Sequence, residues 1–201
     1  MQQIDIPQGT QEWLQQRLGI ITASNMHKVL TGGKGKTRRS YMNQLIGEIM
    51  SGEPAESFSN AYIERGHALE PEARTLYEIE SGNTVVETGF ISTGFKEWRI
   101  GYSPDGLVGD DGLIEIKTKT AALQVEVLRN QVVPAEHIAQ IQTGLFVTGR
   151  KWLDFISFCP MLPIFIKRVF TEEEYIRKKI MVESLVFYQE MYAVMEGIKN
   201  V

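Results

Sequence analysis

The sequence is poor in cysteine, in histidine and in long apolar runs, and it carries no excess of positive charge. Its single cysteine, Cys159, cannot form an internal disulfide, and three scattered histidines give no Cys/His pattern for zinc. No segment approaches the ~20 consecutive apolar residues of a membrane span, and the N-terminal residues lack the basic and apolar regions of a signal peptide. We therefore expect a cytosolic protein in which any metal would be held by oxygen ligands.

Internal repeats, low-complexity tracts and long Pro/Gly/Ser linkers are also absent. A chain of 201 residues, 43% of them hydrophobic, can form one good-sized core but is short for two domains. The sequence thus predicts a single domain over residues 1–201.

The charge is acidic overall but unevenly distributed. A net charge of −4 argues against a protein that binds nucleic acid with its whole surface. Residues 17–47, however, hold no acidic residue and six basic ones, which are Arg17, Lys28, Lys34, Lys36, Arg38 and Arg39. This basic segment is compatible with contact to a polyanion, although its stretch TGGKGKTRRS is also typical of a solvated, flexible loop.

The periodicity of apolar residues predicts mostly helices in the first 81 residues and mostly strands after them. A capping box of Thr171 and Glu174 is expected to open the last helix. The other predicted helices span residues 10–18, 24–33, 41–50, 60–81 and 135–147, and the predicted strands span 84–93, 98–108, 113–119, 152–158 and 164–170. This order indicates an α/β fold with a central mixed β-sheet flanked by helices on both faces.

One segment, GYSPDGLVGDDGLIEIKTKT at residues 101–120, places two acids and a lysine around a predicted turn. The turn signal is GDDG, and pairing symmetric about Asp110 sets Asp105 opposite Glu115. Opposed side chains have Cβ atoms about 4.5–5.5 Å apart, a spacing at which two carboxylates repel each other unless a cation lies between them. Side chains alternate along a strand, so Lys117 shares a face with Glu115, and a register slip of one residue would separate the two acids.

Oxygen ligands of this kind favour Mg²⁺, with Mn²⁺ as a substitute, over zinc. Such an ion, shared with a substrate phosphate, activates water and neutralises the charge that grows on the phosphorus centre. Lys117 would then orient or deprotonate the water, or stabilise the transition state. The bare pattern is weak, because a solvated hairpin with an exposed ion pair worth less than about 1 kcal/mol has the same sequence. The apolar run Leu113, Ile114 and Ile116 favours burial instead, and buried acids need partners.

With these residues in place, the sequence resembles the phage lambda exonuclease group of viral recombinases, a branch of the PD-(D/E)XK nucleases. The similarity covers residues 13–146 and rests on four segments in the same order, RLGIITAS, RGHALEPEARTLYEIESG, SPDGLVGDDGLIEIK and HIAQIQTGLFVTG. The region after Cys159 shows little similarity. The resemblance implies the restriction-endonuclease-like α/β fold of that branch.

The resemblance also implies roles for individual residues. Asp105 and Glu115 match the metal-binding acids, with the backbone carbonyl of Ile116 as a further ligand, and Lys117 matches the catalytic lysine. Glu70 matches a helix carboxylate that faces the same metals through water.

Other matched positions concern the substrate. Gln140 matches an active-site glutamine, whereas Gln142, two residues on, cannot share its helix face. Arg17 and Ser24 match a pocket for the 5′-terminal phosphate, which an arginine fork and a hydroxyl at a helix N-terminus suit, although Ser24 alone would be interpreted as a simple N-cap.

Three further positions can be compared with the family. Lys34 falls where the family has a basic residue in a loop near DNA. Ile63 falls where the family has an apolar wedge between the strand ends, although a core position in the helical stripe fits it equally well. His137 replaces an aromatic, hydroxylated residue, and a supporting or surface role suits it better than catalysis.

The resemblance as a whole implies a Mg²⁺-dependent 5′ to 3′ exonuclease for double-stranded DNA that releases 5′-mononucleotides and leaves 3′ single-stranded tails. It further implies a homotrimeric ring around the duplex and a single-strand annealing protein as partner. Two alternatives stay open: an endonuclease of the same fold, and a catalytically silent DNA-binding module.

Overall fold

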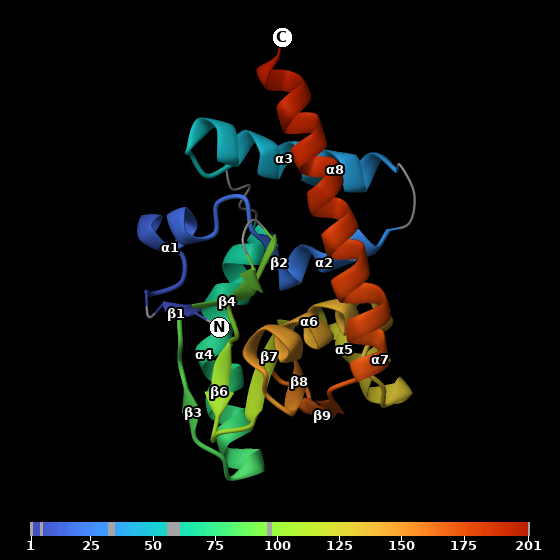
Figure 1. Ribbon diagram of the computed structural model, residues 1–201. Helices are drawn as coiled ribbons and strands as arrows, with labels where there is room; N and C mark the ends of the chain where they lie inside the picture. Colours follow the sequence, from blue (N-terminus) through green and yellow to red (C-terminus); the bar gives the residue numbers. More distant parts are fainter. Residues whose placement is uncertain (1, 5, 32–34, 56–60, 96–97, 201) are drawn as a thin grey trace.

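The strands form two β-sheets in the computed structural model, which describes residues 2–4, 6–31, 35–55, 61–95 and 98–200 (Figure 1). The smaller sheet has the order β1-β4-β5-β2, from β1 (Gln2–Ile4), β4 (Phe90–Phe95), β5 (Trp98–Tyr102) and β2 (Ile21–Thr22). The larger has the order β3-β6-β7-β8-β9, from β3 (Val85–Val86), β6 (Gly106–Val108), β7 (Gly112–Thr118), β8 (Trp152–Phe158) and β9 (Phe165–Phe170).

The larger sheet is mixed, as predicted. Strands β7 and β8 are parallel, while β3–β6, β6–β7 and β8–β9 are antiparallel. The β6–β7 hairpin has the predicted register, since Gly106 pairs with Ile114 and Val108 with Gly112. The symmetry about Asp110 is therefore confirmed, and the hairpin occupies the middle of the sheet.

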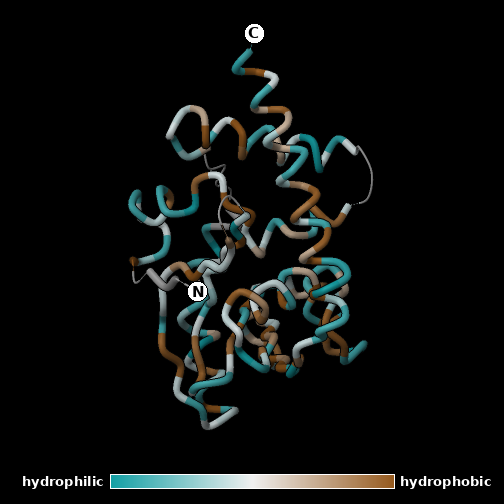
Figure 2. Tube along the Cα trace, in the orientation of Figure 1, coloured by the Kyte–Doolittle hydropathy of each residue, from teal (hydrophilic) through white to brown (hydrophobic). Residues whose placement is uncertain are grey.

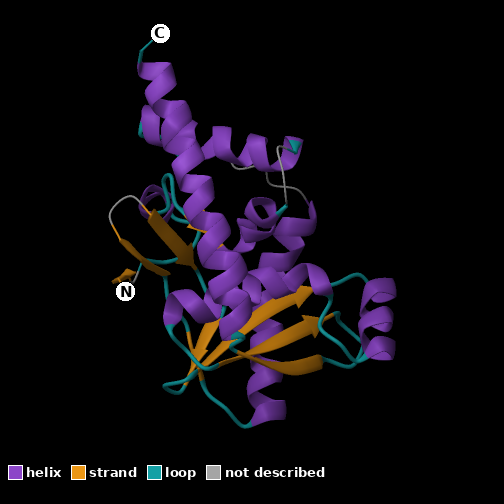
Figure 3. Cartoon of the chain, turned by 45° about the vertical axis from the view of Figure 1, so that its right-hand side comes forward, coloured by secondary structure: helices purple, strands orange, loops and turns teal. Residues whose placement is uncertain are grey.

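Helices cover both faces of this sheet (Figure 3). Helix α4 (Ala61–Ser81) packs Ala73 and Tyr77 against Ile114 and Ile116 on one face. Helix α6 (Ile138–Thr148) packs on the other face, against Leu113 and its neighbours in β8. Because side chains alternate along β7, Glu115 and Lys117 point to the α6 side while Ile114 and Ile116 fill the α4 side. The α/β fold with flanking helices is thus confirmed.

The remaining helices surround these layers. The N-terminal group consists of α1 (Gln11–Gln16), the 3₁₀ turn η1 (Ala23–Asn25), α2 (Met26–Leu30) and α3 (Lys36–Ser51). In the chain, α5 (Ala121–Asn130) and the 3₁₀ turn η2 (Ala135–His137) follow β7 and precede α6. After β9 come α7 (Glu173–Tyr175), the π-helical segment η3 (Ile176–Met181) and α8 (Val182–Lys199). Helix α8 runs from the larger sheet past α2 and α3 to the C-terminus at the opposite end (Figure 1), and its apolar residues alternate with polar ones (Figure 2).

Two predicted strands are each divided between the two sheets. The prediction of one strand over 84–93 was wrong, because β3 belongs to the larger sheet and β4 to the smaller. Likewise the predicted strand 98–108 breaks after Tyr102, so that β5 and β6 lie in different sheets. Pro104 lies in this break, and since proline has no N–H to donate, a ladder cannot run through it. The break leaves Asp105 at the junction of the two sheets.

The prediction of the helices differs from the structure in two places: one helix was missed, and one predicted cap does not form. Helix α5 was not predicted, and the Thr171–Glu174 capping box does not form, since the Thr171 hydroxyl donates to the carbonyls of Arg150 and Lys151 and the helix begins at Glu173. Tertiary hydrogen bonds thus replace the local cap.

Candidate active site

The two acids of the hairpin lie where β6 begins and in the middle of β7. Asp105 Oδ2 accepts a hydrogen bond of 2.6 Å from the backbone N–H of Ile116. This bond continues the hairpin pairing by one step beyond Gly106 and fixes Asp105 beside Glu115. The side chain of Glu115 is only 3% exposed, so its charge is largely removed from water.

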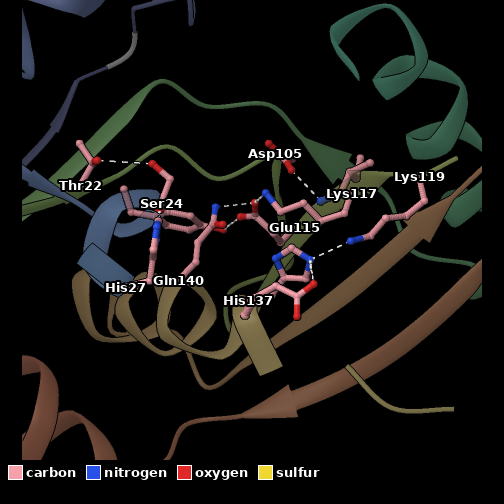
Figure 4. A network of polar contacts seen from close by, with 12 residues as sticks. Thr22, Ser24, His27, Asp105, Glu115, Lys117, Lys119, His137 and Gln140 are labelled. Carbon is pink, nitrogen blue, oxygen red and sulfur yellow. Dashed lines mark hydrogen bonds and ion pairs between the residues drawn. The ribbon is translucent and has the colours of Figure 1, made fainter. Parts of the chain in front are cut away.

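Glu115 is the centre of a hydrogen-bond network (Figure 4). Its Oε1 accepts from Lys117 Nζ at 2.7 Å and from Gln140 Nε2 at 2.6 Å, and its Oε2 accepts from the Tyr102 hydroxyl at 2.6 Å. These donors come from β7, α6 and β5, so three elements fix one carboxylate.

Gln142, in contrast to Gln140, is fully buried and bonds to the backbone at Phe170 and Glu172, in agreement with its predicted exclusion from the site.

Burial and like charge dominate the electrostatics. The pKa of Asp105 is raised well above its ordinary value, first by burial and then by the charges of Glu115 and Glu70. Burial alone would lower the pKa of Lys117, but the negative charges of Glu115 and Asp105 outweigh it and the pKa is raised. The site therefore concentrates negative charge that a single ammonium only partly offsets, which is the environment of a cation site.

Glu70 lies on α4, at the side of this cluster. Its Oε1 accepts from Arg74 Nη2 at 2.7 Å, and Arg74 also pairs with Glu87. Burial first, and the charge of Glu115 among others, raise the pKa of Glu70. Glu70 and Asp105 line the same cavity of about 840 Å³, so the helix carboxylate lies on the side of the site that Asp105 borders.

The donor set fits a hard divalent cation. Asp105 and Glu115 offer carboxylate oxygens in one cavity, the carbonyl of Ile116 follows Glu115 directly in the chain, and Glu70 shares a neighbouring cavity with Asp105. Within the described ranges, no group of three or more His, Cys, Asp or Glu side chains is close enough to form a complete cage on its own. Such an incomplete set is typical of ions that keep water and substrate oxygens in their shell.

Arg17 and Ser24 lie in the same cavity as the acids. This cavity of about 180 Å³ is lined, among others, by Arg17, Ser24, Asp105, Glu115, Lys117 and Gln140. The Arg17 guanidinium stacks on Trp13 at 3.7 Å, and its Nε is buried without an acceptor from any described residue. Burial is also the first cause of its lowered pKa. A buried, unpaired guanidinium nitrogen requires an acceptor, and an anion entering the cavity would supply one.

Ser24 does not cap a helix. It lies in the 3₁₀ turn η1 with an exposed side chain, and its hydroxyl lies 3.4 Å from that of Thr22. Helix α2 begins two residues later with no side-chain cap. The N-cap interpretation of Ser24 is therefore wrong, and the hydroxyl remains available to the cavity.

The segment between Arg17 and Ser24 is fixed from two other helices. Glu48 on α3 accepts from the N–H of Gly19 at 3.0 Å, and the Tyr188 hydroxyl on α8 donates to the carbonyl of Gly19 and accepts from Ile21 N. Gly19 has a φ of +65°, and a Cβ there would lie 2.3 Å from Ile49, so only glycine fits this turn. The pocket thus depends on residues far away in the sequence.

Residues 12–151 match the model of the YqaJ-like viral recombinase domain. The chain belongs to this family. No curated protein matches the sequence. The matched range agrees with the resemblance expected over residues 13–146.

Solved structures place the YqaJ-like chain among alkaline exonucleases. It is 38% identical to an alkaline exonuclease (LHK-Exo) from Laribacter hongkongensis, with a TM-score of 0.86 over 95% of this chain and 97% of the other. A complex of LHK-Exo with dAMP gives 39% identity and a TM-score of 0.87 over the same shares. A phage-related exonuclease from Haemophilus somnus 129PT shares the fold at 18% identity, with a TM-score of 0.64 over 90% of this chain and 96% of the other. The structural likeness extends into the region after Cys159, where sequence similarity was not expected.

The other predicted positions of this YqaJ-like domain have different outcomes. Lys34 and the side chain of Ile63 lie outside the described residues. The basic segment is not one surface, because Arg38 is buried, pairs with Glu190 and stacks over Phe187 at 4.9 Å. His137 is no surface residue either, since its side chain is 15% exposed and stacks on Phe155.

Sequence reasoning missed Tyr102, Trp13 and Gln8. Trp13 stacks on Arg17 and donates to Ser103 Oγ at 3.1 Å. Gln8 donates to the carbonyls of Thr88 and Pro104, next to Asp105. A buried tyrosine requires a partner for its hydroxyl, and this was the one available signal for Tyr102, three residues before Asp105.

None of the helices in the described part of the chain has the length and apolar character of a membrane span.

Proposed function

We propose that this protein is a Mg²⁺-dependent 5′ to 3′ exonuclease for double-stranded DNA that releases 5′-mononucleotides and leaves 3′ single-stranded tails. The observation that carries the proposal is the single cavity that Arg17 and Ser24 share with Asp105, Glu115, Lys117 and Gln140. A site for a terminal phosphate next to a hydrolytic site limits cleavage to the first linkage of a strand.

Each residue has a role in this account. Arg17 and Ser24 bind the 5′-terminal phosphate through charge-assisted hydrogen bonds. The carboxylates of Asp105 and Glu115, the carbonyl of Ile116 and the more distant Glu70 would hold the Mg²⁺ ion, for which Mn²⁺ can substitute. When bound, the ion supplies an activated water and neutralises charge on the phosphate.

The chain's own groups then place the reactants. Lys117 orients or deprotonates the attacking water, or stabilises the charge of the transition state, and Gln140 fixes Glu115 from α6. Water forms a new bond to the scissile phosphorus, the bond to the 3′-oxygen of the first nucleotide breaks, and that oxygen leaves as a hydroxyl. The phosphate stays on the second nucleotide, which becomes the new 5′ end.

The assembly is part of the proposal. The family resemblance supports a homotrimeric ring on the duplex and a single-strand annealing protein that receives the 3′ tail, in the cytosol of a bacterial or phage-infected cell. A ring confines DNA by topology, so only its channel needs positive charge, and this agrees with a net charge of −4.

In the same proposal, Lys34 of the basic segment contacts DNA and Ile63 separates the ends of the two DNA strands. The dAMP complex of LHK-Exo supports a site of nucleotide size.

The test uses three substrates with Mg²⁺: linear duplex with 5′-phosphate, linear duplex with 5′-hydroxyl, and a closed circle. We expect mononucleotides from the phosphorylated ends, an intact circle, and a loss of at least about 10²-fold in rate for Lys117→Ala. Cutting of the circle would favour the endonuclease of the same fold, and DNA binding without hydrolysis would favour the silent binding module.

A further inference from the structure

A second lysine lies at the end of β7, just beyond the site described above. Lys119 is two residues after Lys117, and its Nζ lies 3.1 Å from Nε2 of His137 in η2 (Figure 4). Its backbone is also fixed, because Lys119 N–H donates to Phe158 O and Arg65 Nη1 donates to Lys119 O. The end of β7, the strand of Lys117, and the turn η2, which precedes the helix of Gln140, thus bring a lysine–histidine pair next to the site.

His137 is built to accept a hydrogen bond from this lysine. Its ring stacks on Phe155 with centroids 5.2 Å apart, and burial, followed by the charges of Lys119 and Lys117, lowers its pKa to about 4. The imidazole is therefore neutral at physiological pH, and the 3.8 Å approach of Glu136 is no ion pair. With Nε2 as acceptor, Nδ1 carries the ring proton. His137 thus fixes the ammonium without neutralising it.

The two lysines differ in their charge partners. The ammonium of Lys117 is paired with Glu115 at 2.7 Å. In the described part of the chain, no carboxylate lies within 4.0 Å of Lys119 Nζ, and Glu126 and Glu136 act on it only from a distance. Glu136 is 66% exposed, so water screens its charge. Lys119 therefore presents a half-buried positive charge that the fold positions but does not neutralise.

The order of the groups along the site suggests what this charge meets. Figure 4 shows Thr22 and Ser24 at one end, Glu115 in the middle, and Lys117 followed by Lys119 at the other end. Residues two apart in a strand are separated by about 6.5 Å. Neighbouring phosphates of one nucleic-acid strand have a similar spacing. Lys117 contacts Glu115 at 2.7 Å, so a DNA strand with its terminal phosphate at Arg17 and Ser24 and its scissile phosphate beside Lys117 would place its next phosphate near Lys119.

We propose that Lys119, positioned by His137, binds the internucleotide phosphate between the second and third nucleotides, directly 3′ of the scissile phosphate. This inference rests on the proposed function and adds a third phosphate subsite to it. The three subsites keep the strand in register, because after each cleavage every phosphate moves forward by one subsite.

The closing experiment removes one charge from the DNA and one from the protein. The protein is bound to 5′-phosphorylated duplexes in Ca²⁺, either unmodified or with a neutral methylphosphonate at the linkage between the second and third nucleotides. Affinity is measured for the wild type, Lys119→Gln, and the control Lys151→Gln, which alters an exposed lysine paired with Asp111 at the hairpin turn. Hydrolysis of the unmodified duplex in Mg²⁺ is measured separately.

We expect the methylphosphonate to weaken wild-type binding by about tenfold, as for loss of one charge-assisted hydrogen bond. Lys119→Gln should bind the unmodified duplex about tenfold more weakly and be insensitive to the modification, while Lys151→Gln should match the wild type. Equal wild-type affinity for both duplexes, or a Lys119→Gln protein that is still sensitive, would overturn the subsite. A failure of hydrolysis with these binding differences intact would reject only the proposed activity.

Variants of His137 separate positioning from folding. His137→Gln keeps a hydrogen-bond acceptor and should retain most of the methylphosphonate sensitivity, whereas His137→Ala should lose most of it while its unmodified-duplex affinity falls by less than in Lys119→Gln. Equal sensitivity in both His137 variants would contradict the positioning role.

Discussion

Glu115 is the residue at which the contacts of the site meet. Lys117, Gln140 and Tyr102 all donate to its carboxylate, from three different elements. The hairpin pattern in the sequence could predict the positions of Asp105, Glu115 and Lys117, because strand alternation and the turn signal determine them. It could not predict Tyr102, because its contact with Glu115 depends on how β5 of one sheet meets β7 of the other.

The first prediction concerns the Tyr102 hydroxyl. Tyr102→Phe removes one donor from a buried carboxylate and should cost about 1–3 kcal/mol of unfolding free energy, with a clear loss of Mg²⁺ affinity and of exonuclease rate. Urea denaturation, calorimetric Mg²⁺ titration and rate measurements check this.

A matched control is Tyr77→Phe. Tyr77 donates to Asp154 at 2.8 Å on the α4 side of the sheet, so its loss should lower stability to a similar extent and leave Mg²⁺ affinity unchanged. Equal effects of both variants on Mg²⁺ affinity would show that Tyr102 acts only through general stability.

The second prediction concerns the repulsion between the acids. Asp105→Asn removes one of the like charges that surround Glu115, so the metal-free protein should be more stable than the wild type in EDTA. Adding Mg²⁺ should reverse the order, since a ligand at 100 times its Kd stabilises the wild type by about 2.7 kcal/mol. Thermal unfolding with and without metal gives both values, and a Mg²⁺ shift of equal size in the variant would contradict the assigned ligand.

The third prediction follows from the lowered pKa of His137. The folded protein keeps this imidazole neutral down to about pH 4, while the unfolded chain takes up a proton near the ordinary value of 6.5. The stabilising contribution of neutral His137 is therefore present above pH 6.5 and is lost as the pH falls toward 4. His137→Gln should lose less stability than the wild type across this window, by on the order of 1 kcal/mol.

Denaturation curves at several pH values test this difference. Parallel wild-type and His137→Gln curves would show that folding does not lower the pKa of His137.

At the scale of elements, the hairpin was the most predictable part of the fold. Its register follows from local turn chemistry and strand alternation, and the pairs Gly106–Ile114 and Leu107–Leu113 confirm it. Helix α5 was not predictable in this way. Only Gln124 and Val127 are buried in it, and Gln124 fastens it to the sheet by hydrogen bonds to Ser157 and Pro163. The apolar residues of this helix do not mark its buried face, because Leu123 and Val125 are exposed while Gln124 is fully buried.

The fourth prediction belongs to the hairpin. Arg150 Nη1 donates to the carbonyls of Gly109 and Gly112 at 2.8 and 2.7 Å and so closes the turn. Arg150→Ala should destabilise the protein by about 1–3 kcal/mol, because two carbonyls lose a charged donor. Lys151→Ala, at the neighbouring exposed residue, should change the unfolding free energy by less than about 0.5 kcal/mol. Equal effects of the two in urea denaturation would rule out this role of Arg150.

At the scale of the whole molecule, the site joins segments that are distant in sequence. Arg17 and Ser24 come from the N-terminal helices, the acids from the central hairpin, and Gln140 from the helix after it, while Tyr188 near the C-terminus supports the Arg17 turn. The family resemblance predicted these positions one by one. Their union in one cavity could not be predicted from residue spacing, since it depends on the packing of two sheets and α8.

The central claim is that one cavity binds the terminal phosphate and hydrolyses the adjacent linkage. The most direct test is the ratio of kcat/KM for 5′-phosphorylated over 5′-hydroxyl duplex, in the wild type and in Arg17→Met. The account predicts a wild-type ratio of about 30 or more, as for a charge-assisted pair, and a ratio near one in the variant. A ratio that is unchanged by the loss of Arg17 would contradict the claim.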